Sequence, residues 1–445
     1  MYTLQFHQYV VKMLGMNTIP RHATSAVLWR LGFFRVVVVT GARQVGKSTL
    51  ARQVMDQVGG TYLTLDEPAT LAMATSDPDG MVAEAHGLMV IDEVQRAPDL
   101  LRAVKLSVDR DQRPGRFLLT GSANLLTMRT VTESLAGRAG YLELLPLAWS
   151  EIVRASLPTT IDAAFAAGSA SEFLSALPAP PPDAAAAARE RALAGGMPAT
   201  VGFDRQRRRA WYDGYRTTFL ERDLRQLSEI TAVPEFARLM SLALLRSGGL
   251  LNKSDLAADA SLSFSTVDRY LNLLQVAYQI RLLQPYFVNV GKRLVKSPRL
   301  FAVDSGAVSW AASFTDWAAA AAAGRDGAML ETFAISDIMA WDGLSGESRY
   351  SFWRTGAGAE VDLVIERGED VIGIEIKSAA SVGARDLRGL RALRADLGPR
   401  FKLGILAYLG EEAHALDPTL VAVPLASLLG VGAFPPSDPD GSLAT

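Results

Sequence analysis

Residues 41–48 read Gly-Ala-Arg-Gln-Val-Gly-Lys-Ser, and this spacing of glycine, lysine and serine is suited to holding a polyphosphate. In the pattern G-x-x-x-x-G-K-[ST], the glycines let successive backbone N–H groups point at an anion, and the following helix adds the positive end of its dipole. Lys47 is predicted to reach the β- and γ-phosphates, and the Ser48 hydroxyl to be a Mg²⁺ ligand. The residues predicted to hold ATP are Gly41, Ala42, Arg43, Gln44, Val45, Gly46, Lys47, Ser48 and Thr49.

A pair of adjacent carboxylates follows the apolar run Met89-Val90-Ile91. Consecutive side chains at the end of a strand project differently, so one acid can serve the metal while its neighbour serves a water molecule. Asp92 is therefore predicted to orient the Mg²⁺ shell and to contribute to ATP binding, and Glu93 to activate the water that attacks the γ-phosphate. Downstream of a phosphate loop, this pattern indicates ATP hydrolysis.

Two further positions are candidates for completing such a site. The apolar run Phe117–Thr120 ends in small polar residues, which suggests that Ser122 or Asn124 senses the γ-phosphate, and Asn124 is counted with the ATP-binding residues. A plain polar turn is the alternative. Arg138, in the segment Leu-Ala-Gly-Arg, is a catalytic candidate that would neutralise charge in the transition state, in its own chain or across a subunit interface. A surface arginine is an equally good explanation.

The C-terminal third contains a second set of chemically suggestive residues. The stretches Glu360–Glu366 and Ile372–Lys377 both alternate in polarity. Because side chains change faces at every residue of a strand, Glu360 and Asp362 are expected on one face, and Glu375 and Lys377 on one face of the next strand.

An aspartate followed by Glu-x-Lys resembles the arrangement of magnesium-dependent phosphodiesterases, in which carboxylates hold the metal and the lysine orients the attacking hydroxide. Asp362, Glu375 and Lys377 are therefore the predicted catalytic residues of a second site. Its predicted metal ligands are Asp362, Glu375 and Glu331, the last on an expected helix over 328–339. A hairpin with one solvated, charged face remains the alternative.

The elements that position the first site alternate between strand and helix. Helices are expected from Lys47 and from Pro98, and strands at Val36–Thr40, Tyr62–Leu65, Leu88–Ile91, Phe117–Thr120 and Tyr141–Leu144. This alternation predicts an α/β domain with a parallel sheet.

The region after residue 250 has the spacing of a helix-turn-helix. Helices are predicted at Asn252–Ala260 and Ser265–Leu274, and wing strands at Tyr278–Leu283 and Arg299–Val303. In the nucleic-acid reading, the face from Thr266 to Arg269 approaches a groove of DNA, and the wing-loop residues Lys292, Arg293 and Lys296 contact phosphates. A packing or oligomerisation unit is the equally weighted alternative.

Composition excludes several kinds of site and of protein. The 445 residues include no cysteine, and the four histidines (His7, His22, His86 and His414) are scattered, so disulfides and thiolate zinc sites are excluded and a metal is expected to have oxygen ligands. A net charge of −2 argues against coating nucleic acid non-specifically. The chain lacks a long apolar run, which predicts no membrane span and a cytoplasmic location.

Several of these segments together resemble one family. GARQVGKST, IDEVQRAPDLL, RFLLTGSANLL, SLAGR, KRLVKSPRLF and AEVDLVIE are similar to sequences of bacterial and archaeal AAA-type ATPases that carry a C-terminal domain of unknown function related to restriction-endonuclease-like (PD-(D/E)xK) folds. The resemblance implies an ATPase core followed by a winged-helix segment.

The predicted organisation is a P-loop ATPase domain over 17–150, a helical lid and Ala/Pro-rich connector with a flexible middle over 151–240, a winged-helix module over 241–305, and a restriction-endonuclease-like α/β domain over 306–432. Two functions stay open. One is an ATPase that acts on nucleic acid, with or without metal-dependent cleavage; the other is a nucleotide-controlled oligomeric switch or scaffold whose nuclease-like domain is inactive and docks a partner. Both expect a homo-oligomer with ATP and Mg²⁺.

Overall fold

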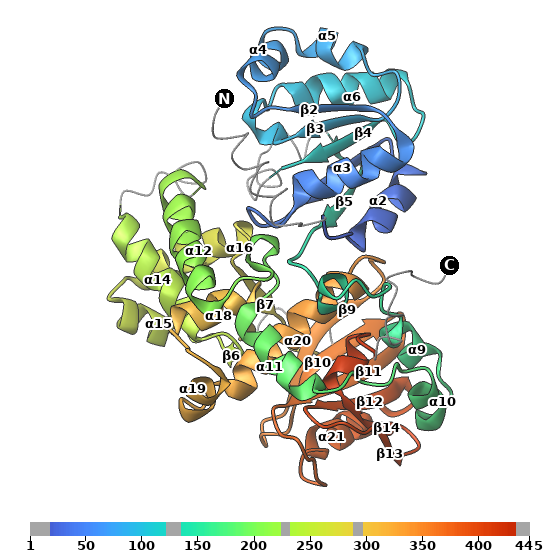
Figure 1. Ribbon diagram of the computed structural model, residues 1–445, viewed down its shortest axis with the longest axis vertical. Coiled ribbons are helices and arrows are strands. Elements are labelled where there is room, and N and C mark those ends of the chain that lie inside the picture. Colours follow the sequence, from blue (N-terminus) through green and yellow to red (C-terminus); the bar gives the residue numbers. More distant parts are fainter. Residues whose placement is uncertain (1–17, 122–134, 224–231, 288–296, 433–445) are drawn as a thin grey trace, which may run out of the picture.

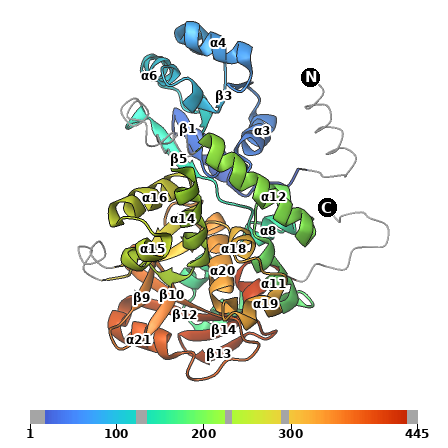
Figure 2. The same cartoon turned by 90° about the vertical axis from the view of Figure 1, so that its left-hand side faces the viewer.

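The computed structural model describes residues 18–121, 135–223, 232–287 and 297–432. Figure 1 shows three parts: an N-terminal sheet with its helices, a mainly helical part, and a C-terminal sheet with its helices. Figure 2 shows the same parts from the side, with the N-terminal sheet and the C-terminal sheet at opposite ends of the long axis. None of the helices in the described ranges combines the length and apolar character needed to cross a bilayer.

The N-terminal sheet is parallel, as predicted. It consists, over the described residues, of β1 (Val36–Thr40), β2 (Thr61–Thr64), β3 (Met89–Asp92), β4 (Phe117–Thr120) and β5 (Ala139–Glu143), in the order β2-β3-β4-β1-β5. The β-branched run of β1 is buried on both faces, as expected for a central parallel strand. All these strands end at one edge of the sheet, and the loop after β1 lies at that edge.

Helices cover both faces of this sheet. On one face lie α2 (Ala23–Leu31) and α3 (Lys47–Val58), whose apolar side chains pack against Val37 and Val39. On the other lie α4 (Pro68–Ser76), α5 (Pro78–Ala83) and α6 (Leu100–Arg110), packed against Val36 and Val38. The two sets of β1 side chains alternate between the two cores because strand side chains alternate between faces. The predicted α/β fold with a parallel sheet is therefore confirmed.

The connector differs from the prediction of a flexible middle. It forms α8 (Trp149–Ile152), α9 (Thr160–Ala166), α10 (Ala170–Ser175), α11 (Ala184–Ala194) and a short 3₁₀ turn, η3 (Pro198–Thr200). Ile161, Phe173 and Ala188 are fully or almost fully buried in the core on one face of the C-terminal sheet. The alanine run favours a helix because alanine loses no side-chain entropy there, and its small side chains allow close packing.

The part from residue 205 to 322 is called the middle module here. Its elements are α12 (Arg205–Thr218), a π-helical turn η4 (Phe219–Asp223), α14 (Val233–Leu245), β6 (Gly249–Leu250), α15 (Lys253–Ala260), α16 (Phe264–Val276), β7 (Ile280–Leu283), β8 (Arg299–Ala302), α18 (Ser305–Ala311) and α19 (Trp317–Ala322). The strands pair antiparallel in the order β6-β8-β7. The Ser263 side chain caps the first turn of α16 by accepting from the Thr266 N–H. Lys292, Arg293 and Lys296 lie outside the described residues.

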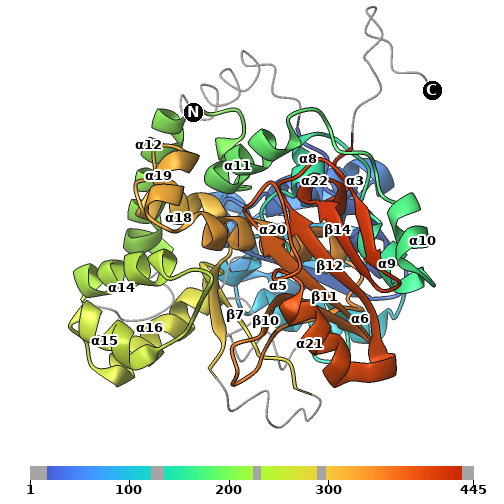
Figure 3. The ribbon, with the colours of Figure 1, turned by 90° about the horizontal axis from the view of Figure 1, so that it is seen from below.

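The C-terminal domain contains a mixed sheet. It follows α20 (Asp326–Asp342) and consists of β9 (Arg349–Arg354), β10 (Glu360–Arg367), β11 (Asp370–Lys377), β12 (Phe401–Tyr408), β13 (His414–Asp417) and β14 (Leu420–Pro424), in the described order β13-β14-β12-β11-β10-β9. The β11–β12 and β12–β14 pairs are parallel. Figure 3 shows this sheet from below, and the remaining helical elements here are α21 (Arg388–Leu397), η5 (Gly398–Arg400) and α22 (Leu425–Leu428).

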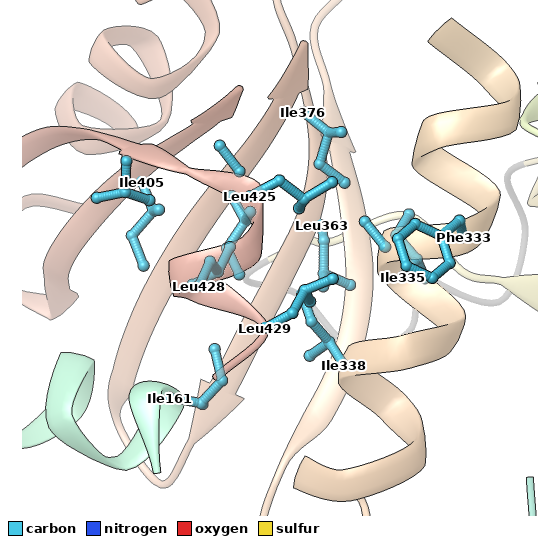
Figure 4. Packing of buried hydrophobic residues seen from close by; sticks show 14 of the residues in the cluster. Ile161, Phe333, Ile335, Ile338, Leu363, Ile376, Ile405, Leu425, Leu428 and Leu429 are labelled. Atoms are coloured by element: carbon cyan, nitrogen blue, oxygen red, sulfur yellow. The ribbon is translucent and has the colours of Figure 1, made fainter. Parts of the chain in front are cut away.

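Two cores hold this sheet in place. Figure 4 shows Leu363 and Ile376 of the sheet packed with Phe333 and Ile338 of α20, with Ile161 of the connector in the same cluster. The opposite face packs against α21. On β10, Val361 and Val364 both belong to this second core, which strict alternation does not allow, because a register shift relative to β9 lies between them. Asp362 lies within that irregularity.

Candidate functional site

The phosphate loop joins the end of β1 to the start of α3 and depends on its glycines. Gly41 and Gly46 have φ values of 145° and 98°, a backbone region that side chains disfavour. A side chain on Gly41 would also lie 2.3 Å from the carbonyl oxygen of Leu144. The sequence therefore forms this turn only with glycine at that position, and the predicted residues from Gly41 to Thr49 lie together around one loop.

Lys47 begins α3 and is 5% exposed. Its Nζ donates to the carbonyl oxygens of Gly41, at 3.1 Å, and Ala42, at 2.9 Å. The ammonium group is thus held above the loop whose N–H groups are predicted to hold phosphates, which is where a cation can compensate the charge of a polyphosphate.

Asp92 ends β3 and accepts hydrogen bonds from neighbouring hydroxyl groups. The Ser48 hydroxyl donates to its Oδ1 at 3.1 Å, and the Tyr62 hydroxyl donates to its Oδ2 at 2.8 Å. Thr120, at the end of β4, also donates to Oδ1. The sequence motifs did not identify Tyr62 or Thr120. Both lie in strands that pair with β3 in the parallel sheet, and that adjacency could have identified them.

The chemistry of this donor set fits Mg²⁺. An aliphatic hydroxyl and a carboxylate are hard oxygen ligands, and Mg²⁺ in nucleotide sites takes few protein ligands because phosphates and water supply the others. Ser48 and Asp92 would hold the ion, which would neutralise phosphate charge when bound.

Glu93 follows Asp92 with a left-handed backbone (φ 59°). Its N–H donates to the Thr120 hydroxyl at 3.3 Å, and the Gln95 amide donates to its carboxylate. Burial raises the pKa of the Glu93 carboxyl, and the charge of Lys47 opposes that rise. A carboxylate with a raised pKa is a better proton acceptor at neutral pH than an exposed one. Asp92 and Glu93 thus occupy distinct environments, and their metal and water roles stay predictions.

Arg21 is a buried residue near the loop that no sequence motif identified. Its Nη1 donates to the Val45 carbonyl of the loop at 2.8 Å, and its Nη2 donates to the Leu145 carbonyl at 2.7 Å. Its Nε pairs with Glu151 at 3.1 Å. The arginine therefore connects the phosphate loop to the segment that follows β5. These partners lie too far from Arg21 in the sequence for a local motif to reveal them.

Arg138 does not lie beside its own phosphate loop. It immediately precedes β5, whose first residue pairs with Val36 at the start of β1, whereas the loop follows the end of β1. The guanidinium donates to Asp109 Oδ1 at 2.6 Å and Oδ2 at 2.9 Å. Arg138 thus lies at the amino edge of the sheet, separated from the loop by about 17 Å of strand. Ser122 and Asn124 lie outside the described residues.

The middle module contacts the edge of the sheet that carries the loop. Arg281 of β7 pairs with Glu143, the last residue of β5, at 2.6 Å. Tyr278 packs against the core cluster that contains Val39 of β1. The ends of β1 and β5 therefore lie next to the middle module.

The second predicted site is also brought together. Glu331 of α20, Asp362 of β10, and Glu375 and Lys377 of β11 form what is called here the carboxylate cluster. Lys377 Nζ lies 2.6 Å from Glu375 Oε1. Burial, followed by the negative charge of Asp362, raises the pKa of both Glu331 and Glu375. Glu360 shares no such burial: it is exposed and lies 3.8 Å from Arg354.

An arginine occupies this cluster. Arg299 Nη1 donates to Asp362 Oδ1 at 3.0 Å, and its Nη2 donates to Glu331 Oε2. The other Asp362 oxygen accepts from the Ile376 N–H at 2.9 Å. Within the described ranges, no group of three or more His, Cys, Asp or Glu side chains could hold a metal ion. The arrangement therefore does not fit a divalent metal. The contacts of Arg299 with Asp362 and Glu331 argue against the prediction that Glu331, Asp362 and Glu375 are metal ligands.

Comparisons with known proteins match three segments of the chain. Residues 34–153 match the model of an AAA domain, residues 186–318 match a domain of unknown function (DUF8612), and residues 326–428 match another (DUF4143). Two uncharacterized mycobacterial proteins, Mb2031c of Mycobacterium bovis and Rv2008c of Mycobacterium tuberculosis, are each 32% identical over 398 residues, which cover 89% of this chain and 81% of theirs. This chain belongs to their family.

The AAA match, the loop and the sheet identify the first part as an AAA-type P-loop domain, of the kind that binds and hydrolyses ATP. Among solved structures, the Walker-type ATPase of Pyrococcus abyssi is similar with a TM-score of 0.42 and 15% identity, covering 66% of this chain and 96% of that one. The RuvB Holliday junction branch migration motor of Thermotoga maritima has a TM-score of 0.26 and 18% identity, covering 61% and 91%. The expected C-terminal domain of unknown function is present, and its nuclease-like nature stays a prediction.

Proposed function

We propose that this protein is a Mg²⁺-dependent ATPase whose nucleotide cycle controls the action of the middle module on nucleic acid. The observation that supports the ATPase is the meeting of Ser48 and Asp92 beside a buried Glu93, at the edge of the sheet where the phosphate loop lies. In hydrolysis, Glu93 accepts a proton from the water that attacks the γ-phosphate, and Lys47 and the loop N–H groups stabilise the negative charge of the phosphates.

The position of Arg138 favours a homo-oligomer. At the amino edge of its own sheet, it is too far from its own loop to reach the γ-phosphate. A neighbouring subunit that presented its phosphate loop to this edge would receive the guanidinium there, and Asp109 would hold it in orientation until then. Arg138 would then act in trans.

Nucleic acid is the proposed partner of the middle module, with α15, α16, β7 and β8 as a winged helix. On α16, Arg269 and Asn272 are exposed, whereas Asp268 is paired with Lys253. A second basic surface lies on one face of α12, where Arg205 and Arg209 are exposed four residues apart. Because phosphate contacts dominate the affinity of such surfaces, α12 supports DNA binding in addition to α16. Arg281 and Tyr278 then connect the DNA-binding elements of the middle module to the nucleotide site.

A second function is favoured by the carboxylate cluster. With Arg299 between Glu331 and Asp362, the C-terminal domain is better suited to docking than to metal-dependent cleavage. In this reading, the protein is a nucleotide-controlled oligomeric switch or scaffold, and the domain holds a partner. The cytoplasmic location of either form stays a prediction.

The test is a set of ATPase and binding assays on the full chain. Lys47→Ala should abolish binding and turnover, whereas Glu93→Gln should abolish turnover and keep binding, with Lys402→Ala on β12 as a charge-matched control. Duplex DNA should then bind more tightly, by anisotropy, to the Glu93→Gln protein with ATP than without nucleotide. ATP turnover by Glu93→Gln at the wild-type rate would reject the proposed base. DNA affinity unaffected by ATP, together with an ATP-dependent change of mass in light scattering, would favour the switch.

A further inference from the structure

Arg299 belongs to the middle module but its side chain lies in the C-terminal domain. It begins β8, which pairs with both β6 and β7, and is 8% exposed. Its guanidinium lies against Phe301, 5.2 Å from the ring centroid, and Phe352, at 6.0 Å. These contacts keep water from a charged group that would otherwise be strongly hydrated.

The guanidinium is held on all sides. Nη1 donates to Asp362 at 3.0 Å and Nη2 donates to Glu331, so one cation bridges carboxylates from β10 and α20. Nε and Nη2 also donate to the Gly248 carbonyl, at 2.9 Å and 2.6 Å. A planar fork with these partners is fixed in one orientation, unlike the flexible ammonium of a lysine.

The backbone that accepts from Arg299 also covers the cluster. The hydroxyls of Ser247 and Thr332 of α20 lie 2.8 Å apart, and Arg325 donates to the Ser247 carbonyl at 3.1 Å. Gly248 has a φ of 85°, and a side chain there would lie 3.1 Å from Ala328 Cβ. The segment before β6 therefore packs directly on the start of α20, in the part of the helix that carries Glu331.

While Arg299 is in place, the carboxylate oxygens of the cluster that it does not contact are too few to bind a divalent ion. Asp362 uses one oxygen for Arg299 and the other for the Ile376 N–H. Glu375 uses Oε1 for Lys377, and its buried Oε2 has no hydrogen-bond partner among the described residues. A divalent cation needs several oxygens at once, so it would have to displace the guanidinium from both Glu331 and Asp362.

We infer that Arg299 is a built-in replacement for a metal ion: it closes the carboxylate cluster and uses it to fasten the middle module to the C-terminal domain. The cluster is then a docking site for a residue of this same chain. The inference does not depend on ATP hydrolysis, because none of its residues lies at the phosphate loop.

The experiment is a titration of the nucleotide-free full chain with Mn²⁺, in which free Mn²⁺ is followed by electron paramagnetic resonance. Wild type and Glu375→Gln should bind the same number of ions, because the cluster holds none. Arg299→Gln, which removes the charge and shortens the side chain, should gain one Mn²⁺ per chain, and Arg299→Gln with Glu375→Gln should lose it again. Arg299→Lys, which keeps the charge, should gain none.

Two results would overturn the inference. One is an Mn²⁺ ion bound by wild type and lost in Glu375→Gln, a comparison that needs no change at Arg299 and stays informative if the arginine variants do not fold. The other is an Arg299→Gln protein that has wild-type circular dichroism and wild-type ATP binding but gains no ion.

Discussion

The Tyr62 hydroxyl donates to Asp92 Oδ2 at 2.8 Å, while Ser48 donates to the other oxygen of the same carboxylate at 3.1 Å. One oxygen thus faces the phosphate loop, and the other is held by the neighbouring strand β2. The sheet orients the carboxylate, so the position of the proposed Mg²⁺ ligand depends on a tyrosine that has no predicted contact with ATP.

Tyr62→Phe should therefore weaken metal use more than nucleotide binding. The loss of one partly buried hydrogen bond corresponds to about 1 kcal/mol, or roughly a fivefold change in the Mg²⁺ concentration that gives half-maximal ATPase activity. The measurement is an Mg²⁺ titration at saturating ATP, with Tyr141→Phe on β5 as the control. An unchanged Mg²⁺ requirement would mean that Asp92 is oriented without Tyr62.

The raised pKa of Glu93 predicts an acidic limb in the pH profile of kcat. Glu93 must be deprotonated to accept a proton from water, so activity should rise as pH increases through its pKa and level off above it. Because burial raises that pKa, the rise should lie above the ordinary range for glutamate. Glu93→Gln should remove the limb together with activity, and Glu84→Gln, at an exposed position, should keep both. A profile that is flat down to pH 4.5 in the wild type would contradict this assignment of the base.

Arg138 should act on the nucleotide of a neighbouring subunit. Arg138→Ala and Lys47→Ala should each be inactive, but mixing the two proteins should restore part of the activity, because the Lys47→Ala subunit supplies an intact Arg138 to an intact loop. Asp109→Ala, which removes the partner of Arg138, is the control for a purely structural role and should retain activity. A mixture no more active than its components would exclude action in trans.

Arg21 should stabilise the phosphate loop through a buried ion pair. Arg21→Ala leaves Glu151 buried without its partner, which should lower the free energy of unfolding by about 3–5 kcal/mol. Urea unfolding followed by circular dichroism measures this. Arg52→Ala, on α3, is the control and should cost far less. ATP should also stabilise the Arg21→Ala protein less than the wild type, since the Val45 carbonyl has lost its donor.

Arg281 and Glu143 should couple the middle module to the nucleotide site. Arg281→Glu places a carboxylate opposite Glu143 and should reduce any effect of DNA on ATP turnover, while combining it with Glu143→Arg should restore that effect. The pair is about one-third exposed, so high salt should weaken the coupling in the wild type. If DNA stimulated ATP turnover equally in the wild type, in Arg281→Glu and in the double variant, the ion pair would have no part in the coupling.

Much of the fold could be read from local patterns. The β-branched run of β1, the glycines at 41 and 46 and the acids that end β3 specify backbone conformation within a few residues, and so the parallel sheet, the loop and the helix starting at Lys47 were predictable. Parallel strands also end at one edge, which is why Ser48 and Asp92 could be expected to meet.

Other features depended on partners far apart in the chain. The alanine-rich connector was predicted to have a flexible middle, but it forms packed helices because the C-terminal sheet offers an apolar face that only the folded domain creates. Alternation predicted that Glu360 and Asp362 share one face, but it could not predict that Glu360 is exposed while Asp362 is buried against Arg299. That burial depends on the middle module, a distant element, and not on the local pattern.

The sequence by itself determined the nucleotide-binding loop and the residues able to do chemistry, because their backbone and spacing requirements are local. Only the tertiary structure decided which of those residues have their expected surroundings. It placed Arg138 at the far edge of its own sheet and Arg299 between Glu331 and Asp362. Both are side chains whose partners are set by the packing of distant elements, which short-range periodicity does not encode.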